Sequence, residues 1–421
     1  MRTKKIVPWV MWGISTLYFF FDFINQVIPA ALGTQLRAAF HVDASTFGLI
    51  SSCYFYSYAI LQIPVGLTVD RFGPRRPLAA AALIAGTGCL LFSMASSPVI
   101  AAITRMVVGA GAAFSFVSCL KLAANWFPAN RFATIVGLTN VVGMLGAVSG
   151  EGPISKLGES LGWRETIWLV AAFGLSLALI IFLFVRDQPE PTINRGSSTL
   201  SSHILTDLSY LLSQRDAWFA GIYAATINTS FIAFGALWGT LFIQARFQIS
   251  QAHAAAMVSI LFIGAIPGSF FFGWFADRIQ GFKLPMAIGA SGGLMSMALL
   301  LYVPDLSVWI VDGLLFLLGF FCSSNVLAYA SNARTGALDA EGTSLGFTNT
   351  WLIGGSALFQ PLIGWLLQQN PSVQQQESIH HLSLADFQIP LTTIVISLFI
   401  ALIMSLLIKD RYHIHTLADQ S

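Results

Sequence analysis

Charged residues are scarce in this chain. Asp, Glu, Lys and Arg make up 10% of its 421 residues, hydrophobic residues make up 56%, and the mean hydropathy is +0.73. A soluble globular chain carries about 25% charged residues, so this composition excludes that class and predicts a polytopic membrane protein. The net charge of +2 comes from short basic clusters spread along the chain. We therefore expect a lipid bilayer around the protein and no nucleic-acid partner.

Cysteine is also rare, and no group of residues suggests a reaction centre. The four cysteines lie within apolar runs, without the spacing of a metal site or a disulfide framework. Free buried cysteine behaves as a small hydrophobic residue, so we interpret all four as packing residues. No catalytic grouping appears, and the polar loops are too short to hold a separate domain. We expect no enzyme, no cofactor and no metal site.

What the chain does contain is a series of long apolar runs. The first ends near residue 28, and further runs follow near 45–68, 77–96, 98–125, 132–154, 163–185, 217–243, 253–275, 284–303, 307–330, 342–368 and 388–408. About 20 apolar residues in a helix cross the ~30 Å hydrocarbon core of a bilayer. The sequence therefore predicts an all-α membrane protein with twelve transmembrane helices and both termini on one side.

The positions of Lys and Arg predict the orientation. Segments on the side of the N-terminus carry fifteen of them, and segments on the opposite side carry only Arg37, Lys156, Arg164 and Arg246. Because basic loops stay on the cytoplasmic side, we expect both termini to be cytoplasmic. We further expect a multi-pass monomer in a bacterial inner membrane.

A polar stretch divides the chain into two halves. We predict a six-helix bundle over residues 1–186, a cytoplasmic linker over 187–216 and a second six-helix bundle over 217–421. The linker begins with Pro- and Ser-rich sequence, which is typical of a flexible connection. Its segment 204–214 has the spacing of a short amphipathic helix at the membrane surface.

The two halves repeat in sequence. Gly137-Leu-Thr-Asn140 recurs 209 residues later as Gly346-Phe-Thr-Asn349, and the same offset pairs Glu151 with Gln360. An internal repeat of this kind indicates that the two halves are related. We therefore predict that the six-helix bundles are pseudo-symmetric.

A charged turn between the second and third runs is the most specific motif. It reads Gly66-Leu-Thr-Val-Asp70-Arg71-Phe-Gly73-Pro-Arg75-Arg76 and returns, in weaker form, as Gly273-Trp-Phe-Ala-Asp277-Arg278-Ile-Gln-Gly281-Phe-Lys283. This pattern resembles the loop between helices 2 and 3 of the major facilitator superfamily. Arg105 with Gly109 and Gly111 resembles the helix-4 motif of the same family. Trp126-Phe-Pro128 with Arg131, followed by Gly162-Trp163-Arg164, is similar to the organic-anion symporter and nitrate or oxalate porter branches.

The resemblance implies alternating access, with the charged turns as part of an inner gate. A carboxylate beside a helix N-terminus is favoured by roughly 0.3–1 kcal/mol, and Asp70 and Asp277 are placed to meet helices of the opposite half. The candidate gating residues are Gly66, Asp70, Arg71, Gly73, Arg75, Gly273, Asp277 and Arg278. The alternative is that these basic loops serve only to orient the chain.

Three acids within or near the apolar runs are candidates for proton coupling: Asp22, Glu151 and Asp312. Ionisable groups in a membrane are costly and usually face a bundle interior. Asp22 is the best placed, at mid-helix with Arg105 at a similar depth, so the two are predicted either to pair structurally or to act in coupling. Glu151 is equally consistent with a helix interface, and Asp312 with the outer membrane surface.

Polar residues that share helix faces are candidates for binding the transported molecule. They are Asn25, Tyr54, Tyr58, Arg105, Asn140, Asn228, Trp238, Asn325, Tyr329, Asn349 and Gln360. Arg105 is either the counter-ion of Asp22 or the anchor for an anionic group of the substrate. For the aromatic stripes, packing is the alternative.

These features together predict a secondary active transporter of a small polar solute, such as an organic anion, with proton-coupled uptake. Two alternatives stay open at this point. One is an exporter of drugs, metabolites or siderophores. The other, from a different class, is a transporter-like sensor or a structural membrane protein.

Overall fold

The computed structural model describes residues 3–187, 209–335, 341–369 and 383–409. All regular elements within these ranges are helices. Those of the first half are α1 (Thr3–Ala31), α2 (Gly33–Phe40), α3 (Ala44–Phe72), α4 (Arg75–Ser93), α5 (Pro98–Ala112), α6 (Ser115–Trp126), α7 (Ala129–Leu161) and α8 (Trp163–Phe184). Five predicted spans of this half are unbroken, whereas the predicted run 98–125 is divided between α5 and α6.

The second half contains more interruptions. Its elements are α10 (Arg215–Ile227), the π-helix η1 (Ser230–Trp238), α11 (Gly239–Phe247), α12 (Gln251–Ile279), α13 (Lys283–Tyr302), α14 (Val308–Cys322), the 3₁₀ turn η2 (Ser323–Asn325), α15 (Val326–Thr335), α16 (Glu341–Thr350), the π-helix η3 (Trp351–Gly355), α17 (Phe359–Gln368) and α19 (Leu384–Leu407). Wide π turns within α-helices often occur at functional sites. Both π segments belong to the seam between the halves.

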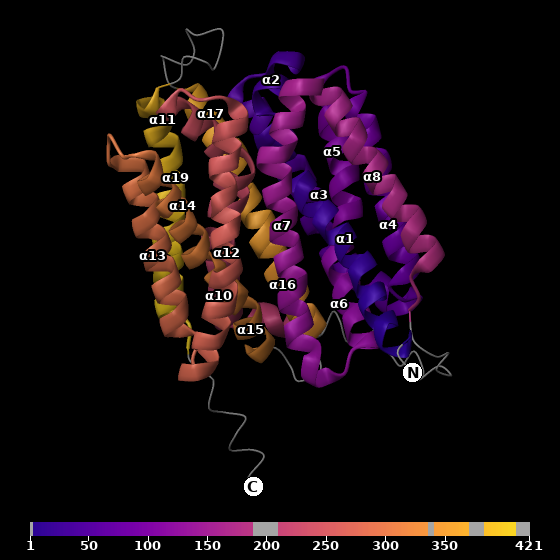
Figure 1. Ribbon diagram of the computed structural model, residues 1–421. Coiled ribbons are helices and arrows are strands. Elements are labelled where there is room, and N and C mark those ends of the chain that lie inside the picture. Colours follow the sequence, from indigo (N-terminus) through magenta and orange to yellow (C-terminus); the bar gives the residue numbers. More distant parts are fainter. Residues whose placement is uncertain (1–2, 188–208, 336–340, 370–382, 410–421) are drawn as a thin grey trace.

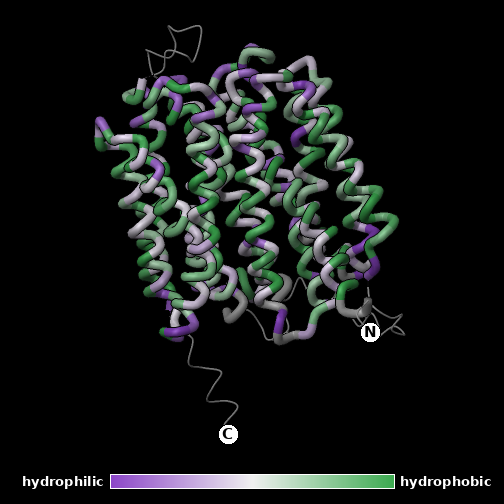
Figure 2. The backbone as a smooth tube through the Cα atoms, viewed as in Figure 1, coloured by the Kyte–Doolittle hydropathy of each residue, from purple (hydrophilic) through white to green (hydrophobic). Residues whose placement is uncertain are grey.

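Eleven stretches of the described residues are long and apolar enough to cross a membrane. The helix α3 is the remaining predicted span. It has 29 residues but is less apolar, because it carries serine, tyrosine and glutamine side chains that the fold buries. The all-α, membrane-spanning fold predicted from the sequence is therefore confirmed. Hydrophobic residues line the middle of most helices, and hydrophilic residues gather toward the ends (Figure 2).

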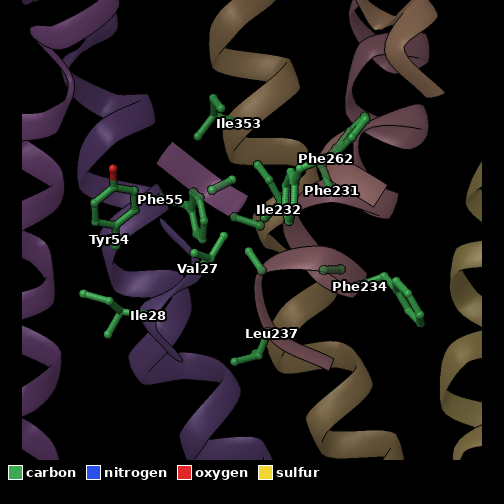
Figure 3. Close-up of a cluster of buried hydrophobic side chains, with 14 of the residues drawn as sticks. Val27, Ile28, Tyr54, Phe55, Phe231, Ile232, Phe234, Leu237, Phe262 and Ile353 are labelled. Atoms are coloured by element: carbon green, nitrogen blue, oxygen red, sulfur yellow. The ribbon is translucent and has the colours of Figure 1, made fainter. Parts of the chain in front are cut away.

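The two halves lie side by side (Figure 1), and the start of α1 and the end of α19 are at the same, lower end of the molecule. Across the seam, α7 packs on α12, α3 packs on α16 and α17, and α1 packs on η1. Side chains from both halves fill this seam. Figure 3 shows Phe55 and Val27 of the first half facing Ile232 and Ile353 of the second.

Two glycines place matching helices in backbone contact. A Cβ atom at Gly109 would clash with the carbonyl oxygen of Tyr54, and one at Gly319 would clash with that of Leu261. The absence of a side chain therefore allows α5 to touch α3, and α14 to touch α12. Because the same contact occurs at related positions, the two halves share one internal architecture.

The seam is tight at the upper end, which carries α2 and α11, and looser at the lower end. A Cβ atom at Gly48 on α3 would lie 2.6 Å from the carbonyl oxygen of Gln360 on α17. At the lower end, a Cβ atom at Gly66 or Gly273 would meet no heavy atom of the described chain within 4 Å. The close approach expected for these two glycines is thus not made in this conformation.

The linker between the halves lies mostly outside the described residues. Of the amphipathic segment predicted over 204–214, residues 209–213 are helical and 204–208 are not described. Leu211 is buried against Ala217 and Phe347, and the indole of Trp218 donates to the carbonyl oxygen of Leu212 at 2.8 Å. The end of the linker is therefore attached to α10 and α16.

Candidate functional site

Asp22 is completely buried on α1 and is held by three donors. The Tyr54 hydroxyl donates to Oδ1 in a short hydrogen bond, and Gln26 Nε2 donates to the same oxygen at 3.3 Å. Ser115 Oγ donates to Oδ2 at 2.5 Å. Ser115 is the first residue of α6, directly after the break that separates this helix from α5. The break thus supplies one of the two strongest donors to the carboxylate.

Arg105 is buried on α5, one helical turn before Gly109. Its guanidinium carbon lies 4.7 Å from the centroid of the Tyr54 ring, a cation–π contact, and Nη1 donates to the carbonyl oxygen of Asn25 at 2.8 Å. The side chain is 1% exposed, and its Nε and Nη2 atoms have no hydrogen-bond partner among the described residues. An unsatisfied buried donor is costly, so these atoms form a ready site for an anionic group.

Asp22 and Arg105 do not form the direct pair that the sequence allowed. Tyr54 lies between them, with its hydroxyl on Asp22 and its ring against Arg105. In Figure 3, Tyr54 and Phe55 point to opposite sides, because Phe55 faces the second half and Tyr54 faces the interior of its own half. Tyr54 holds this place because Gly109 brings α5 against its backbone. One aromatic side chain therefore connects the acid to the arginine.

Asn25 contacts Arg105 through its backbone, while its side chain bonds other residues. Its carbonyl oxygen holds Arg105, its Nδ2 donates to the carbonyl oxygen of Phe21 at 2.8 Å, and its Oδ1 accepts from the Cys89 thiol at 2.9 Å. The side chain is 1% exposed. Asn25 therefore positions Arg105, and Cys89 adds a weak donor to the packing role predicted for it.

The second half has an uncharged counterpart of this arrangement. Asn325 Nδ2, at the break between α14 and α15, donates to Asn228 Oδ1 at 3.1 Å. Asn228 Nδ2 donates to the carbonyl oxygen of Leu352 at 3.0 Å and to Ser356 Oγ at 3.2 Å. Leu352 belongs to η3, where the wide turn leaves its carbonyl oxygen available to a side chain. The Asn228–Asn325 pair of the second half therefore corresponds to the Asp22–Ser115 pair of the first half.

Gln360 and Trp238 lie at the seam near the upper end, which carries α2 and α11. Gln360 Nε2 donates to the carbonyl oxygen of Ile232 in η1 at 2.7 Å, and Trp238 Nε1 donates to the Gln360 carbonyl oxygen at 3.0 Å. Ser52 Oγ, on α3 of the first half, donates to Gln360 Oε1 at 3.1 Å. Gln360 thus crosses the seam through Ser52, and the ring of Trp238 packs edge-on against Phe47 of α3.

A second polar connection crosses the seam lower down. Tyr329 donates to Asn349 Oδ1 at 2.6 Å, and Asn349 Nδ2 donates to Gln62 Oε1 at 2.7 Å. Gln62 Nε2 lies 3.4 Å from the carbonyl oxygen of Tyr58. Since Gln62 and Tyr58 are on α3 and Asn349 is on α16, this hydrogen bond joins the halves between the site and the looser end.

The other predicted acids and Asn140 are not part of the Asp22 group. Glu151 is completely buried on α7, where Oε2 accepts from Thr240 of α11 at 3.3 Å and Oε1 has no partner among the described residues. Asp312 is half-buried on α14, which packs mainly on α12 and α13. Asn140 is half-buried on α7. The structure therefore places Glu151 at the seam and Asp312 away from Asp22.

The first charged turn is fastened within its own half. The backbone N–H of Arg75 donates to Asp187 Oδ1 at 2.7 Å, and Arg75 Nη2 donates to the carbonyl oxygen of Phe182 at 2.7 Å. Gly73 has φ of +73°, and a Cβ atom there would approach Asp187 Oδ1 to 2.9 Å. Arg71 is exposed, and the side chain of Asp70 lies outside the description. In the second turn, Asp277 and Arg278 are exposed at the end of α12.

At the upper end, which carries α2 and α11, Asp43 joins α3 to α17. It caps α3 by accepting from the Thr46 backbone N–H at 2.7 Å, and it accepts from Gln368 Nε2 at 2.8 Å. Desolvation raises the pKa of Asp43, but these hydrogen bonds and the charge of Arg37 outweigh it, so its pKa lies below the ordinary value. Burial lowers the pKa of Arg37 to about 10. Both groups are therefore charged at neutral pH.

The residues missed by the sequence interpretation are mostly hydroxyl donors. Ser52, Ser115 and Thr240 each donate to a residue that was predicted. A single serine or threonine in an apolar run has no periodic signature, because its role depends on which helix lies opposite.

Comparison with known proteins identifies the family. The family model of the Major Facilitator Superfamily matches residues 14–360. The chain belongs to the Major Facilitator Superfamily. The relatives and the fold are those of membrane transporters, which are not enzymes, as the sequence predicted.

Relatives within the superfamily are distant. A "Probable sulfoacetate transporter" of Cupriavidus necator is 28% identical over 178 residues, which cover 42% of this chain and 41% of that protein. A "Probable hexose phosphate transport protein" of Chlamydia pneumoniae is 24% identical over 384 residues, 84% of each chain. A bacterial homologue of the human lysosomal transporter Spinster, solved in an inward-facing and unoccupied conformation, matches with a TM-score of 0.76 at 15% identity, over 97% of this chain and 98% of that one.

Proposed function

We propose that this superfamily member is a proton-coupled secondary active transporter that takes up a small organic anion by alternating access. The observation that carries the proposal is the buried Arg105 guanidinium, with two N–H-bearing atoms unpartnered among the described residues, connected through Tyr54 to the buried carboxyl of Asp22. The relatives named for sulfoacetate and hexose phosphate support an anionic cargo.

Arg105 suits the recognition of an anion for two reasons. A guanidinium presents its donors in a planar fork that matches carboxylate, sulfonate or phosphate oxygens. The Tyr54 ring and the Asn25 carbonyl oxygen fix the orientation of that fork before the substrate arrives, which reduces the cost of ordering on binding. We propose that the substrate anion accepts hydrogen bonds from Nε and Nη2.

Asp22 provides the coupling to protons in this proposal. When an anion binds at Arg105, a second negative charge enters a region of low dielectric, and two like charges there disfavour each other. A proton on Asp22 removes that repulsion. Cargo and proton are therefore favoured together on one side of the membrane and released together on the other.

The packing of the seam supports alternating access. A Cβ atom at Gly48 would clash with Gln360 at the end that carries α2 and α11, whereas one at Gly66 or Gly273, toward the lower end, would meet no described heavy atom within 4 Å. We propose that the lower end is cytoplasmic, as are both termini, that the membrane is a bacterial inner membrane and that the chain acts as a monomer. Residues 1–186 and 217–421 would then rock as two bodies joined by the linker 187–216.

Replacing Tyr54 with phenylalanine is expected to shift the pH dependence of uptake. The variant removes a donor to the ionised Asp22 but leaves the ring against Arg105. A hydrogen bond to a charged group contributes about 1.5 kcal/mol, so half-maximal uptake should move to higher pH by roughly one unit. Uptake against external pH, with the KM for the anion at saturating proton concentration, measures this.

Ser115→Ala is the matched control, because it removes the donor to the other oxygen of Asp22 without touching Arg105. It should shift the pH profile in the same direction and leave the anion KM unchanged. Tyr54→Leu, which also removes the ring, should raise that KM. Identical pH profiles for the wild type and Tyr54→Phe would contradict the role of Tyr54.

Asp70→Asn is expected to slow transport while the protein remains folded and reaches the membrane. In the proposed gate, Asp70 meets the start of α16 when the lower end closes, and a carboxylate at a helix N-terminus contributes roughly 0.3–1 kcal/mol. A roughly two- to fivefold lower rate of uptake should result. Asp277→Asn changes the equivalent acid of the other half and should have a similar effect, whereas normal rates in both variants would exclude a gating role.

Purified full-length protein in sealed vesicles tests the proposed function. With an inward gradient of a transported anion, a symporter acidifies the vesicle lumen. An exporter that exchanges cargo for protons makes the lumen more alkaline, and a sensor or structural protein produces no proton movement that depends on the anion. A lumen pH that stays constant for every anion tried, with protein that is folded and inserted, would overturn the proposal.

A further inference from the structure

The two faces of the seam carry different charge although the halves share one architecture. The contact between Gly109 and Tyr54 in the first half corresponds to the contact between Gly319 and Leu261 in the second. One turn before Gly109 is Arg105, and one turn before Gly319 is Leu315, which is fully buried. The second half therefore has leucine where the first half has its buried arginine.

The acid is replaced in the same way. In the first half, Asp22 accepts from Ser115 at the break between α5 and α6. In the second half, Asn228 accepts from Asn325 at the break between α14 and α15. The second half thus repeats the geometry of the site with neutral groups.

The other basic residues of the described chain are occupied or distant from this site. Arg164 donates to the carbonyl oxygens of Ser93 and Ala95, and Arg246 donates to those of Leu300 and Val303 at 2.8 and 2.7 Å. Lys121 lies on α6, beyond the break that follows α5 and sixteen residues after Arg105. The remaining basic residues of the described chain lie in turns or near helix ends: Lys4, Lys5, Arg37, His41, Arg71, Arg75, Arg76, Arg131, Lys156, Arg186, Arg215, His253, Arg278, Lys283, Arg334 and Lys409.

The polar groups that the second half brings to the seam are amides and a phenol. Asn325 and Tyr329 are half-buried, and Asn349 is held by Tyr329 on one side and Gln62 on the other. Amides and hydroxyls both donate and accept, which suits hydroxyl groups of a ligand. They carry no charge to balance a second anionic group, and a buried unpaired charge is strongly disfavoured.

We infer that the substrate carries one negative charge at neutral pH, bound by Arg105, on a chain of neutral hydroxyl groups bound by the second half. A sugar acid with one carboxylate has this chemistry, and a dianion such as a dicarboxylate or a phosphate monoester does not. This inference rests on the proposed function, since it assumes that an anion binds at Arg105.

Four probes of similar six-carbon size test the charge. Binding of glucose, gluconate, glucarate and glucose 6-phosphate to the purified full-length protein at pH 7.5 is measured by calorimetry. Gluconate, with one carboxylate, should bind at least tenfold more tightly than glucarate, with two, and glucose should not bind measurably. Equal or tighter binding of glucarate or glucose 6-phosphate would overturn the inference while leaving an anion transporter intact.

Changing the charge of one compound gives a second measurement. A phosphate monoester has its second pKa near 6, so the singly charged fraction of glucose 6-phosphate rises roughly 30-fold between pH 7.5 and pH 5. Gluconate stays ionised over this range and serves as the reference for any change in the protein. The affinity of glucose 6-phosphate relative to gluconate should increase by about that factor, and a constant ratio would count against a singly charged substrate.

The Arg105→Gln variant distinguishes a failure of the singly charged substrate from a failure of the proposed anion transport. It should lose gluconate binding and with it the preference for one charge over two. If the wild type binds none of the anions, and vesicles take up none, the proposed function itself fails. If anions bind equally well to the variant, Arg105 is not their anchor and the inference fails with it.

Discussion

Arg105→Gln is expected to lower anion uptake by at least about 100-fold. Glutamine is of similar length but has no charge and no fork of donors, so the anion loses its counter-charge at a buried position. Removing one partner of a buried charged pair costs about 2–5 kcal/mol, and about 2.8 kcal/mol corresponds to 100-fold in affinity. Uptake of a labelled anion into vesicles, over a range of concentrations, would show the loss mainly as a higher KM.

Arg105→Lys is the informative companion. It keeps the positive charge but loses the planar fork and the stacking on Tyr54, and lysine does not replace arginine at a bidentate, stacked position. We expect intermediate uptake. Arg164→Gln controls for general effects of removing an arginine, because Arg164 donates to the backbone carbonyl oxygens of Ser93, at the end of α4, and Ala95, just after it. Wild-type uptake by Arg105→Gln would refute the proposed anchor.

Asp22→Asn is expected to abolish accumulation driven by a pH gradient while leaving exchange of the anion across the membrane. Asparagine has nearly the same shape and still accepts from Tyr54 or Ser115, but it cannot take up a proton. Because the variant carries no proton with the anion, a pH gradient cannot drive accumulation. The ratio of anion concentration inside the vesicles to that outside should therefore fall to about one. Exchange of labelled for unlabelled anion at equal pH should remain within a few fold of the wild type.

Two outcomes would change this assignment. If Asp22→Asn still accumulates the anion when the exterior is acidic, the coupling proton is held elsewhere, and Glu151 becomes the leading candidate. Glu151→Gln is a conservative test of that site, because Gln360 already occupies the related position in the other half. If Asp22→Asn loses exchange as well as accumulation, Asp22 has a structural role and is not the coupling acid.

The sequence predicted the helical fold well because its signals are strong and local. Runs of apolar residues define the spans, and rare charges such as Asp22 and Arg105 stand out against them. The repeat of the Gly-x-Thr-Asn pattern indicated two related halves. The breaks between α5 and α6 and between α14 and α15 were not predicted, since the apolar pattern continues through both.

The arrangement of the candidate residues is less accessible from the sequence than the fold. The sequence singles out Asp22, Tyr54 and Arg105 and allows a direct pair of Asp22 with Arg105. The observed link through Tyr54 requires α5 to touch α3 at Gly109. That approach depends on two helices far apart in the sequence, so residue spacing within one helix does not reveal it.

The sequence by itself determined that this protein is a helical membrane protein of two related halves, because hydropathy and repeats are properties of each segment alone. Only the tertiary structure decided which polar groups meet. It placed Tyr54 between the acid and the arginine, set Asp312 apart, and matched the charged site of one half with a neutral copy in the other. Hydrogen bonds across helices act over about 3 Å, and such distances are fixed by helix packing rather than by the order of residues.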